Sequence, residues 1–568
     1  KFPYAARDTP GSYGSACVYS PLMAPRRVAI IGAGPSGLVA LKECMEAGLE
    51  ATAFERSGRL GGIWSHGVWD SLRVNLSRAT CCFSDFPWAP SADEYPTGEA
   101  MRAYLEAYAD RFHLRPHIRL RSHVRCSFTV SGWSVERHPE ASPEAGTDGY
   151  GEFDFLVVAS GIFDRPHWPS IPGLDQLPHA LVLHSQQYRN LEELGGSGSG
   201  GGDSGDGGEG ERRPLLVVGG AFSGAEIAAD LSASGARVLL STRTAHYYLP
   251  TTSEAGVPLD LLFYQYGAAP AALEERHARL REIGLPMGLP SPDARKEPRV
   301  AITDRLGPEL RRGAVRLCAA VQSFGVRSDG SPMAFFADGS SEGFARCVLA
   351  TGFDSSALGK MLPQELLEGA EYMPNDQLMP LLLPLETLHP FYRTVAFVGY
   401  YRGPFFGVIE LQARLAAALF AGRCQWPSPD GMSAMVAEAR ERRCGSGSAG
   451  RRQFSQDYPA HAAALATTLG AAPPTVLPTV PALPLVPALF RLRELASLGR
   501  SWQGGLLHRL RPWLAWLLLL DAQLSKRPPA MTNALGGRVW RVGWRGCRWV
   551  VRAIAWALGL VAVRRLPA

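Results

Sequence analysis

The sequence predicts an α/β fold with two Rossmann-like units, and two glycine-rich turns are the basis of that prediction. One turn, Gly32–Gly37, follows the apolar run Val28–Ile31, and the other, Gly219–Gly224, follows the apolar run 215–218. A buried strand, a tight glycine turn and a helix in succession are typical of a unit that binds a dinucleotide. Two such units in one chain predict an enzyme that holds two dinucleotides and passes electrons between them.

The composition is that of a globular protein with two or three domains. The chain has 568 residues, of which 46% are hydrophobic, enough for a sizeable core. Its net charge of +5 is uneven, because nine basic residues and no acidic residue follow Asp521. The rest of the chain is mildly acidic, which argues against general nucleic-acid binding. The ten cysteines form no CxxC pair and no cluster with zinc spacing, so we expect reduced thiols and no metal site.

The first unit is expected over 24–165, after a loose leader over 1–23. Its second strand ends near Phe54-Glu55. Residues 99–113 place apolar side chains at helical spacing, which predicts a helix. Residues 154–161 form a short apolar run that ends in a turn, which predicts a buried strand.

The second unit is expected over 166–330, inserted into the first. Residues 195–213 are mostly Gly, Ser, Asp and Glu and cannot form a core, so we expect a disordered insert there. Cys347–Gly352 repeats the strand-to-turn pattern of 154–161. A short strand at 397–399 and a helix over 408–421 follow.

The remaining boundaries complete the domain prediction. We assign 331–427 to the second part of the first unit. We expect a low-order linker over 428–500, where Pro, Ala, Leu and Val gather late in the segment, and a basic hydrophobic tail over 501–568.

The first turn suits FAD or NAD. Gly32 permits the bend, Gly34 lets the backbone approach a pyrophosphate, and Gly37 lets the helix pack closely on the sheet. Glu55 ends the second strand, where a carboxylate bonds ribose hydroxyls and repels a 2′-phosphate. The alternative is a tight turn without a ligand.

The second turn suits NADP. Ala221 replaces the middle glycine. Its methyl group narrows the space in which the backbone can approach a pyrophosphate, but it does not abolish binding. In this unit the acidic residue that would bind the ribose hydroxyls is expected within 239–244. That segment has no acidic residue but contains Arg243. A guanidinium with neighbouring hydroxyls suits a 2′-phosphate, although Arg243 is alternatively an ordinary surface arginine. A flavin and NADPH together make a flavin oxidoreductase. The adjacent Cys81 and Cys82 are poorly placed for the bridge of a disulfide reductase.

Several further segments resemble the flavin-containing monooxygenase family over about 24–425. They are Arg59–Trp64, Ser71–Arg78 followed by Ser84–Pro87, Leu349–Phe353 and Glu410–Arg414. The identifying motif of the family aligns imperfectly over 178–189. Its histidine (His184), its tyrosine (Tyr188) and its basic residue are present, but its aromatic residue and glycine are not. The related Baeyer–Villiger enzymes carry Trp at the Tyr188 position, which weighs against that subclass, and we interpret His184 as structural.

The resemblance implies FAD and NADPH as cofactors and O2 and a small nucleophile as substrates. NADPH reduces FAD, O2 forms a C4a-hydroperoxide on the flavin, and a soft nucleophile takes the distal oxygen, which amounts to N- or S-oxygenation. Asn75 matches the active-site asparagine of the family, with a turn-forming Asn as the alternative. Trp64 is expected beside the flavin or as a core aromatic, and Gln412 toward the pyrimidine side of the flavin.

The candidate site residues form two sets. For FAD they are Gly32, Ala33, Gly34, Pro35, Ser36, Gly37, Glu55, Arg56, Gly62, Ile63, Trp64, Asn75 and Gln412, with Asn75 also catalytic; for NADP they are Gly219, Ala221, Ser223, Gly224 and Arg243.

Two other functions stay open. One is oxidative decarboxylation of a 2-oxo acid, as in auxin-forming relatives. The other is a degenerate member that binds FAD without turnover, which Ala221 and the altered motif suggest. Substrate identity and oligomeric state are open.

The tail predicts contact with a membrane surface. Its apolar stretches, 512–520 and 553–563, are shorter than the roughly 20 residues that a membrane span requires. Tryptophans alternate with arginines there, which favours an interfacial helix. The alternative is a helix docked on the protein itself. Some relatives are anchored at the endoplasmic reticulum, so we expect a cytoplasmic location or the cytoplasmic face of that membrane.

Overall fold

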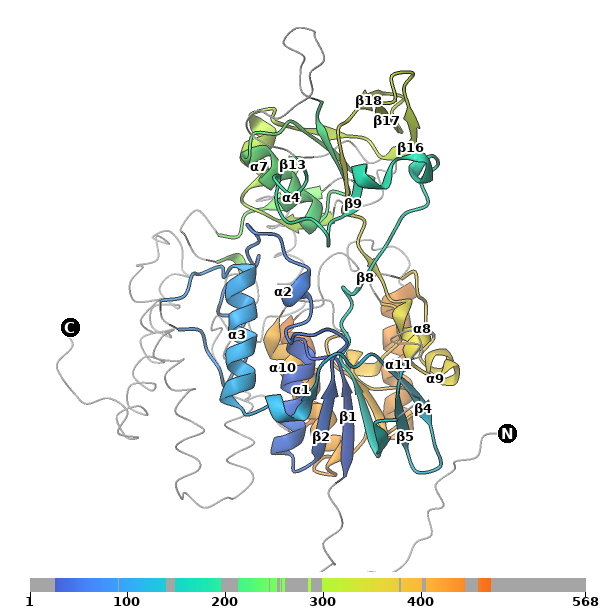
Figure 1. Cartoon of the computed structure of the whole chain (residues 1–568). Coiled ribbons are helices and arrows are strands. Elements are labelled where there is room, and N and C mark those ends of the chain that lie inside the picture. Colours follow the sequence, from blue (N-terminus) through green and yellow to red (C-terminus); the bar gives the residue numbers. More distant parts are fainter. Residues whose placement is uncertain are drawn as a thin grey trace, which may run out of the picture.

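Two parallel sheets organise the chain, as the two glycine turns predict. The computed structural model describes residues 26–89, 91–138, 149–195, 213–244, 246–252, 256, 258–260, 285–287, 299–376, 379–400, 405–444 and 458–470. Each sheet is the centre of one α/β unit, and the two units lie one above the other in Figure 1. We call them the first and the second unit in chain order.

The first sheet has the strand order β21-β7-β1-β2-β3, and all neighbouring strands are parallel. Its strands are β1 (Arg27–Ile31), β2 (Glu50–Phe54), β3 (Ile118–Arg119), β7 (Phe155–Val158) and β21 (Val395–Phe397). These runs are almost continuously apolar because both faces of the sheet are covered.

Helices cover one face of the first sheet and a small antiparallel sheet covers the other. Val28 and Ile30 of β1 belong to one core with α1 (Pro35–Glu46), α3 (Gly98–Arg111) and α10 (Phe406–Phe420). Ala29 and Ile31 belong to the opposite core. That core includes residues of β4 (Val124–Phe128), β5 (Trp133–Arg137), β6 (Gly151–Phe153), α8 (Ala357–Met361) and α9 (Gln364–Gly369).

Local sequence explains where the helices begin. Pro35 starts α1, where its fixed φ suits the first turn and its missing N–H is not needed. Thr97 caps α3 by accepting a hydrogen bond from the Ala100 N–H at 3.1 Å. The predicted helices at 99–113 and 408–421 are confirmed as α3 and α10, within two residues at each end.

The second sheet has the strand order β15-β11-β10-β19-β9, again with parallel neighbours. Its strands are β9 (Val182–His184), β10 (Leu215–Val218), β11 (Val238–Ser241), β15 (Val315–Cys318) and β19 (Cys347–Leu349). One face packs on α4 (Phe222–Ala233) and α7 (Leu306–Arg311). The other packs on β16 (Val321–Val326) and β17 (Pro332–Phe336), whose partner is β18 (Ser341–Gly343).

The second unit is inserted into the first, between β7 and β21. The chain enters through β8 (Arg165–Pro166) and returns through β20 (Phe353–Asp354), and these two crossings pair as antiparallel strands. Figure 1 shows β8 between the two units.

Short elements complete the described chain. They are α2 (Ile63–His66), η1 (Arg115–His117), η3 (Leu174–Gln176), η4 (His179–Leu181), β12 (His246–Leu249), β13 (Leu285–Met287), β14 (Arg299–Ile302), η5 (Pro384–Glu386), α11 (Pro429–Cys444) and α12 (Tyr458–Thr468).

The predicted domain boundary at 330/331 is wrong. β19 lies after it but pairs with β10 and β9, so this strand belongs to the second sheet. The apolar run of β19 predicts a buried strand correctly. A buried run carries no signal of which sheet it joins, because both sheets bury their strands on both faces.

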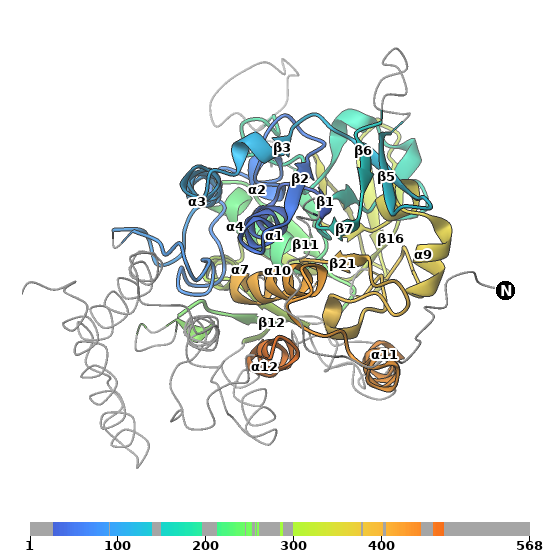
Figure 2. The ribbon, with the colours of Figure 1, turned by 90° about the horizontal axis from the view of Figure 1, so that it is seen from below.

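The predicted low-order linker over 428–500 is wrong at α11 and α12. Ala462, Leu465 and Ala466 of α12 are fully buried in the same core as α10, and α12 lies near α10 in Figure 2. Small alanines give little amphipathic signal, so the packing partner decides whether this segment is helical. The predicted leader 1–23, almost all of the insert 195–213 and the tail 501–568 lie outside the described residues.

We expect Leu465→Ala to lower the free energy of unfolding by about 2–5 kcal/mol, because it removes a fully buried side chain between α12 and α10. Leu120→Ala is the matched control, since Leu120 is 41% exposed. The control should change stability by less than about 0.5 kcal/mol in urea unfolding. Equal effects of the two substitutions would show that α12 is not part of the core in solution.

Candidate active site

The first glycine turn is a backbone cradle at the end of β1. Gly32 has φ +106°, and a Cβ there would lie 2.5 Å from the carbonyl oxygen of Ala159 at the end of β7. A Cβ at Gly37 would overlap the carbonyl oxygen of Gly32. Only glycine fits either position. The start of α1 therefore reaches the strand ends, where its positive end can hold a phosphate.

A second glycine pair closes the cradle from the other side. The N–H of Gly61 donates to the Ala33 carbonyl at 2.8 Å, and Gly62 has φ +59°. A Cβ at Gly34 would lie 3.5 Å from the Cα of Gly62, so the two backbones approach closely. α2 begins at Ile63 directly after this pair. Gly34 and Gly62, both predicted site residues, are brought together.

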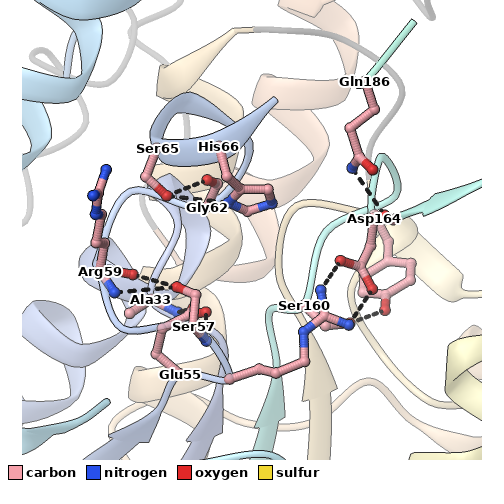
Figure 3. A network of polar contacts seen from close by, with 12 residues as sticks. Ala33, Glu55, Ser57, Arg59, Gly62, Ser65, His66, Ser160, Asp164 and Gln186 are labelled. Atoms are coloured by element: carbon pink, nitrogen blue, oxygen red, sulfur yellow. Dashed lines mark hydrogen bonds and ion pairs between the residues drawn. The ribbon is translucent and has the colours of Figure 1, made fainter. Parts of the chain in front are cut away.

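Glu55 lies beside the cradle, with only 8% of the residue exposed. Its Oε2 accepts from the Ala33 N–H and its Oε1 from the Ser57 N–H, each at 2.8 Å. A carboxylate has about four acceptor positions, so these two bonds leave capacity for ribose hydroxyls. Figure 3 shows Glu55 directed at Ala33 and Ser57, while Asp164 lies apart from them, directly before β8. The donor set fits a dinucleotide whose ribose carries no 2′-phosphate.

Two other predicted residues surround this site. Arg56 pairs with Asp164 through its Nη1 at 3.2 Å and is half exposed, so it links the end of β2 to the residue before β8. Trp64 is half-buried and packs against the cores of both units. Trp64 therefore lies at the junction of the two units.

Gln412 is fully buried, and both of its polar atoms are bonded within the protein. Its Oε1 accepts from the Gly399 N–H at 3.0 Å and its Nε2 donates to the Glu386 carbonyl at 2.8 Å. Gly399 lies so close to Ser36 that a Cβ would overlap the Ser36 hydroxyl. We interpret Gln412 as holding the turn after β21 against the start of α1.

The second glycine turn repeats the geometry of the first. Gly219 has φ +114° and faces the carbonyl oxygen of Ala350, as Gly32 faces that of Ala159. A Cβ at Gly224 would overlap the Gly219 carbonyl oxygen. Ala221 is the exposed N-cap of α4, and Ser223 is half-buried in its first turn. The methyl group of Ala221 therefore faces outward, where it does not obstruct the turn itself.

Arg243 follows the end of β11 and is exposed. Thr242 beside it is buried, and its hydroxyl donates to the Thr244 carbonyl at 2.6 Å. By strand register, Thr242 takes the position that Glu55 has in the first unit, and the cation Arg243 follows it, with no carboxylate within 239–244. This donor set fits a 2′-phosphate.

Asn75 lies in a bend of the irregular segment after α2. Val74 donates from its N–H to the Pro96 carbonyl at 2.9 Å, which fixes the segment near the start of α3. Asn75 itself is half-buried, and its side-chain amide makes no hydrogen bond to another described residue. A partly buried amide with free donors and acceptors can serve a ligand.

The altered motif over 178–189 joins the two units. His184 is completely buried; its Nε2 bonds to the Gly352 carbonyl at 2.9 Å, and its Nδ1 accepts from the Gln186 N–H at 3.2 Å. These bonds fix the neutral tautomer, and burial lowers the pKa of His184 to about 4. Tyr188 is also buried and donates to Asp230 at 2.7 Å. The contacts support the structural interpretation of His184.

Three charged residues at this junction were not predicted from the sequence: Asp230, Arg305 and Asp260. Arg305 donates to Asp230 at 2.8 Å, while Asp260 accepts from Ser77 and Thr80. A carboxylate on α4 is a weak signal for Asp230, because this helix also carries Glu226. Asp260 and Arg305 have no local signal, because their partners are distant in the chain.

The described residues contain no group of three or more His, Cys, Asp or Glu side chains that could hold a metal ion. None of the helices they form is long and apolar enough to cross a membrane.

Comparison with known proteins identifies relatives of the whole described region. A model of the family described as flavin-binding monooxygenase-like matches residues 25–485. The N-oxide-forming dimethylaniline monooxygenase 2 of Rattus norvegicus is 29% identical over 481 residues, covering 79% of this chain and 83% of the relative. Flavin-containing monooxygenase 2 of Homo sapiens is 28% identical over the same length and coverage.

Solved structures share the fold. The S-allyl-L-cysteine S-oxygenase of Allium sativum aligns with a TM-score of 0.55 and 20% identity, over 84% of this chain and 94% of that one. Cyclohexanone monooxygenase of Rhodococcus sp. Phi1, bound to NADP+, aligns with a TM-score of 0.52 and 16% identity, over 84% and 99%.

We expect the free energy of unfolding to fall as pH decreases from about 6.5 to about 4, partly through His184. In this window the unfolded histidine binds a proton that the buried one, with its pKa lowered to about 4, does not. The effect of one such group is at most about 3 kcal/mol. His184→Gln should lower stability at pH 7.5 but flatten this decline in urea unfolding at several pH values. The exposed His179, changed to Gln, should leave the decline as in wild type.

Proposed function

The chain belongs to the flavin-binding monooxygenase-like family, and from that membership we propose that it inserts one oxygen atom of O2 into an amine nitrogen or a thioether sulfur. It is a flavin monooxygenase that uses FAD and NADPH. The curated relatives named for N-oxide formation support the choice of a soft nucleophile as substrate. The structural observation that supports it best is the unbonded amide of Asn75, in a segment of the first unit that Ser71 and Ser77 bond to the second unit.

We assign FAD to the first cradle and NADPH to the second. The Glu55 carboxylate repels a 2′-phosphate, whereas Arg243 attracts one. The start of α1 and the start of α4 each present backbone N–H groups to a pyrophosphate. The two cradles have the same backbone geometry, so charge at the adenosine end distinguishes the two dinucleotides.

The protein's own residues bind, orient and exclude water. When bound, the flavin supplies the redox chemistry that activates O2, with electrons from NADPH. Trp64, packed between the two cores, shields the junction from solvent. The amide of Asn75 donates a hydrogen bond to the reacting oxygen and has no ionisable proton to lose at neutral pH. No general acid or base pair is required by this scheme.

Product analysis separates this function from the two alternatives. N- or S-oxygenation adds one oxygen atom to an intact amine or thioether, whereas oxidative decarboxylation releases CO2 from a 2-oxo acid. A degenerate member would hold FAD without NADPH-dependent O2 uptake. A screen of the three substrate classes, with NADPH consumption and product mass as readouts, decides among them.

We also propose that 501–568 contacts an anionic membrane surface, at the cytoplasmic face of the endoplasmic reticulum. The support is the sequence, in which tryptophans alternate with arginines and no acidic residue follows Asp521. This segment lies outside the described residues.

Arg243→Ala should raise the KM for NADPH about ten- to a hundredfold, because a charge-assisted contact of this kind contributes about 1.5–3 kcal/mol. The KM for NADH should change little, since NADH has no 2′-phosphate. Arg237→Ala is the matched control: this arginine is exposed at the opposite end of β11. Wild-type protein that uses NADH as well as NADPH would refute the assignment of the second cradle.

Asn75→Leu should still bind FAD and still accept electrons from NADPH, because Glu55 and both glycine turns are untouched. Oxygenated product should fall by about 10²–10³, the usual effect of losing one positioned polar contact, while hydrogen peroxide rises. Flavin absorbance, NADPH consumption, product mass and peroxide are measured on the same samples. A variant with wild-type product yield would show that Asn75 only forms a turn and takes no part in the reaction.

A further inference from the structure

The segment that carries Asn75 is bonded at its first end to the second unit. The Ser71 hydroxyl donates to Asp230 on α4, and Arg305 donates to the Ser71 hydroxyl at 2.8 Å. The same carboxylate accepts from Arg305 at 2.8 Å and from the Tyr188 hydroxyl at 2.7 Å. Ser71 is therefore fixed to a four-residue polar cluster whose other members belong to the second unit or its entry linker.

The other end of the segment is bonded to a different carboxylate of the second unit. Asp260 Oδ2 accepts from the Ser77 N–H at 2.9 Å, from the Ser77 hydroxyl at 2.8 Å and from the Thr80 hydroxyl at 2.7 Å. Ser77 is 0%, Thr80 4% and Asp260 5% exposed. Three donors converge on one buried oxygen, so no water replaces it at low cost when the carboxylate is removed.

The charge of Asp260 is also felt by the neighbouring thiol. Burial is the main cause that raises the pKa of Cys81, and the Asp260 carboxylate raises it further. Cys81 is therefore protonated and unreactive. A carboxylate with no thiolate to repel it can keep its three hydrogen bonds.

Asn75 lies between these two anchors, four residues after Ser71 and two before Ser77. Its amide is left free while the residues on both sides are held by the second unit. We propose that Asp260 and Asp230 are positioning residues, which hold the Asn75 segment to the second unit and so set where the Asn75 amide lies. This inference rests on the proposed function of Asn75.

The consequence is a coupling between the two units. The segment belongs to the first unit in sequence, yet its polar anchors come from the unit assigned to NADPH. A shift of the second unit relative to the first therefore moves Asn75. Loss of an anchor should loosen the segment locally without disturbing Glu55 or the first glycine turn.

The test uses the FAD-loaded full chain with Asp260→Ala, Asp260→Asn and Thr80→Val. Backbone hydrogen exchange over 72–82 is measured without substrate, and the peroxide formed per NADPH is measured during turnover. Exchange at the Ser77 amide should rise at least about tenfold in Asp260→Ala, because its acceptor is gone, and less in Asp260→Asn, which retains one amide oxygen. The peroxide formed per NADPH should likewise rise more in Asp260→Ala than in Asp260→Asn, with FAD content as in wild type.

Asp338→Asn is the matched control. Asp338 also accepts from an N–H and a hydroxyl, those of Ser340, at 3.0 and 2.6 Å, but this pair lies in the turn between β17 and β18 of the second unit. It should change neither exchange over 72–82 nor the peroxide fraction. Thr80→Val keeps the side-chain shape and removes one donor, so it tests the anchor even when Asp260→Ala does not fold.

Four results would overturn the proposal. Two concern folded Asp260→Ala: unchanged exchange over 72–82, or faster exchange with an unchanged peroxide fraction. The others are an equal effect of Asp338→Asn and, where Asp260→Ala does not fold, unchanged exchange in Thr80→Val. The exchange measurement needs no product. It therefore tests the anchors even when wild-type protein oxygenates none of the substrates. Failure to oxygenate any substrate would refute the proposed function and not the anchoring of the segment.

Discussion

In both units a strand, a glycine turn and a helix meet so closely that a single added carbon would not fit. Gly32 faces the Ala159 carbonyl, and Gly219 faces that of Ala350. The contact brings the start of each helix to the carboxyl ends of three parallel strands, because the third strand of each set supplies the facing alanine. Everything that binds a dinucleotide here depends on this approach. It puts backbone N–H groups and the positive helix end where a pyrophosphate can reach them. The short Ala-Ser-Gly and Ala-Thr-Gly turns are thus parts of the cradles, not connections only.

The contact between the units combines apolar packing with polar anchors. Trp69 and Leu72 pack into the apolar core of the second unit, and the Asn75 segment is in addition bonded to Asp230, Arg305 and Asp260. Apolar packing is non-directional and tolerates sliding, whereas a carboxylate that accepts several hydrogen bonds fixes one arrangement. A buried carboxylate without its donors is unfavourable, so the segment has one strongly preferred position. A junction of this kind suits a site that must be assembled from two units.

Sequence predicted most of the cradles and little of the junction. The two turns, Glu55 and the helices α3 and α10 follow from local patterns: glycine spacing, a strand end and apolar periodicity. The sheet that β19 joins does not, because every strand of both sheets is a short apolar run. α12 was missed since its alanines become a helix only through packing on α10. Asp260 lies 180 residues from Thr80 in the chain, and no local pattern reports a pairing of that range.

The glycine cradles and the polar anchors between the units explain how one backbone arrangement can bind two cofactors and also hold a reacting group in place. The cradles are rigid and nearly identical, so they do not discriminate between the dinucleotides; single charged residues, Glu55 and Arg243, do so at the adenosine end. The reacting end needs a polar group that is free, and a free amide keeps its place only when its neighbours are fixed. Ser71 and Ser77 are fixed by the opposite unit, and Asn75 between them is not bonded within the described structure. The same arrangement that leaves Asn75 available therefore makes its position depend on both units being in place.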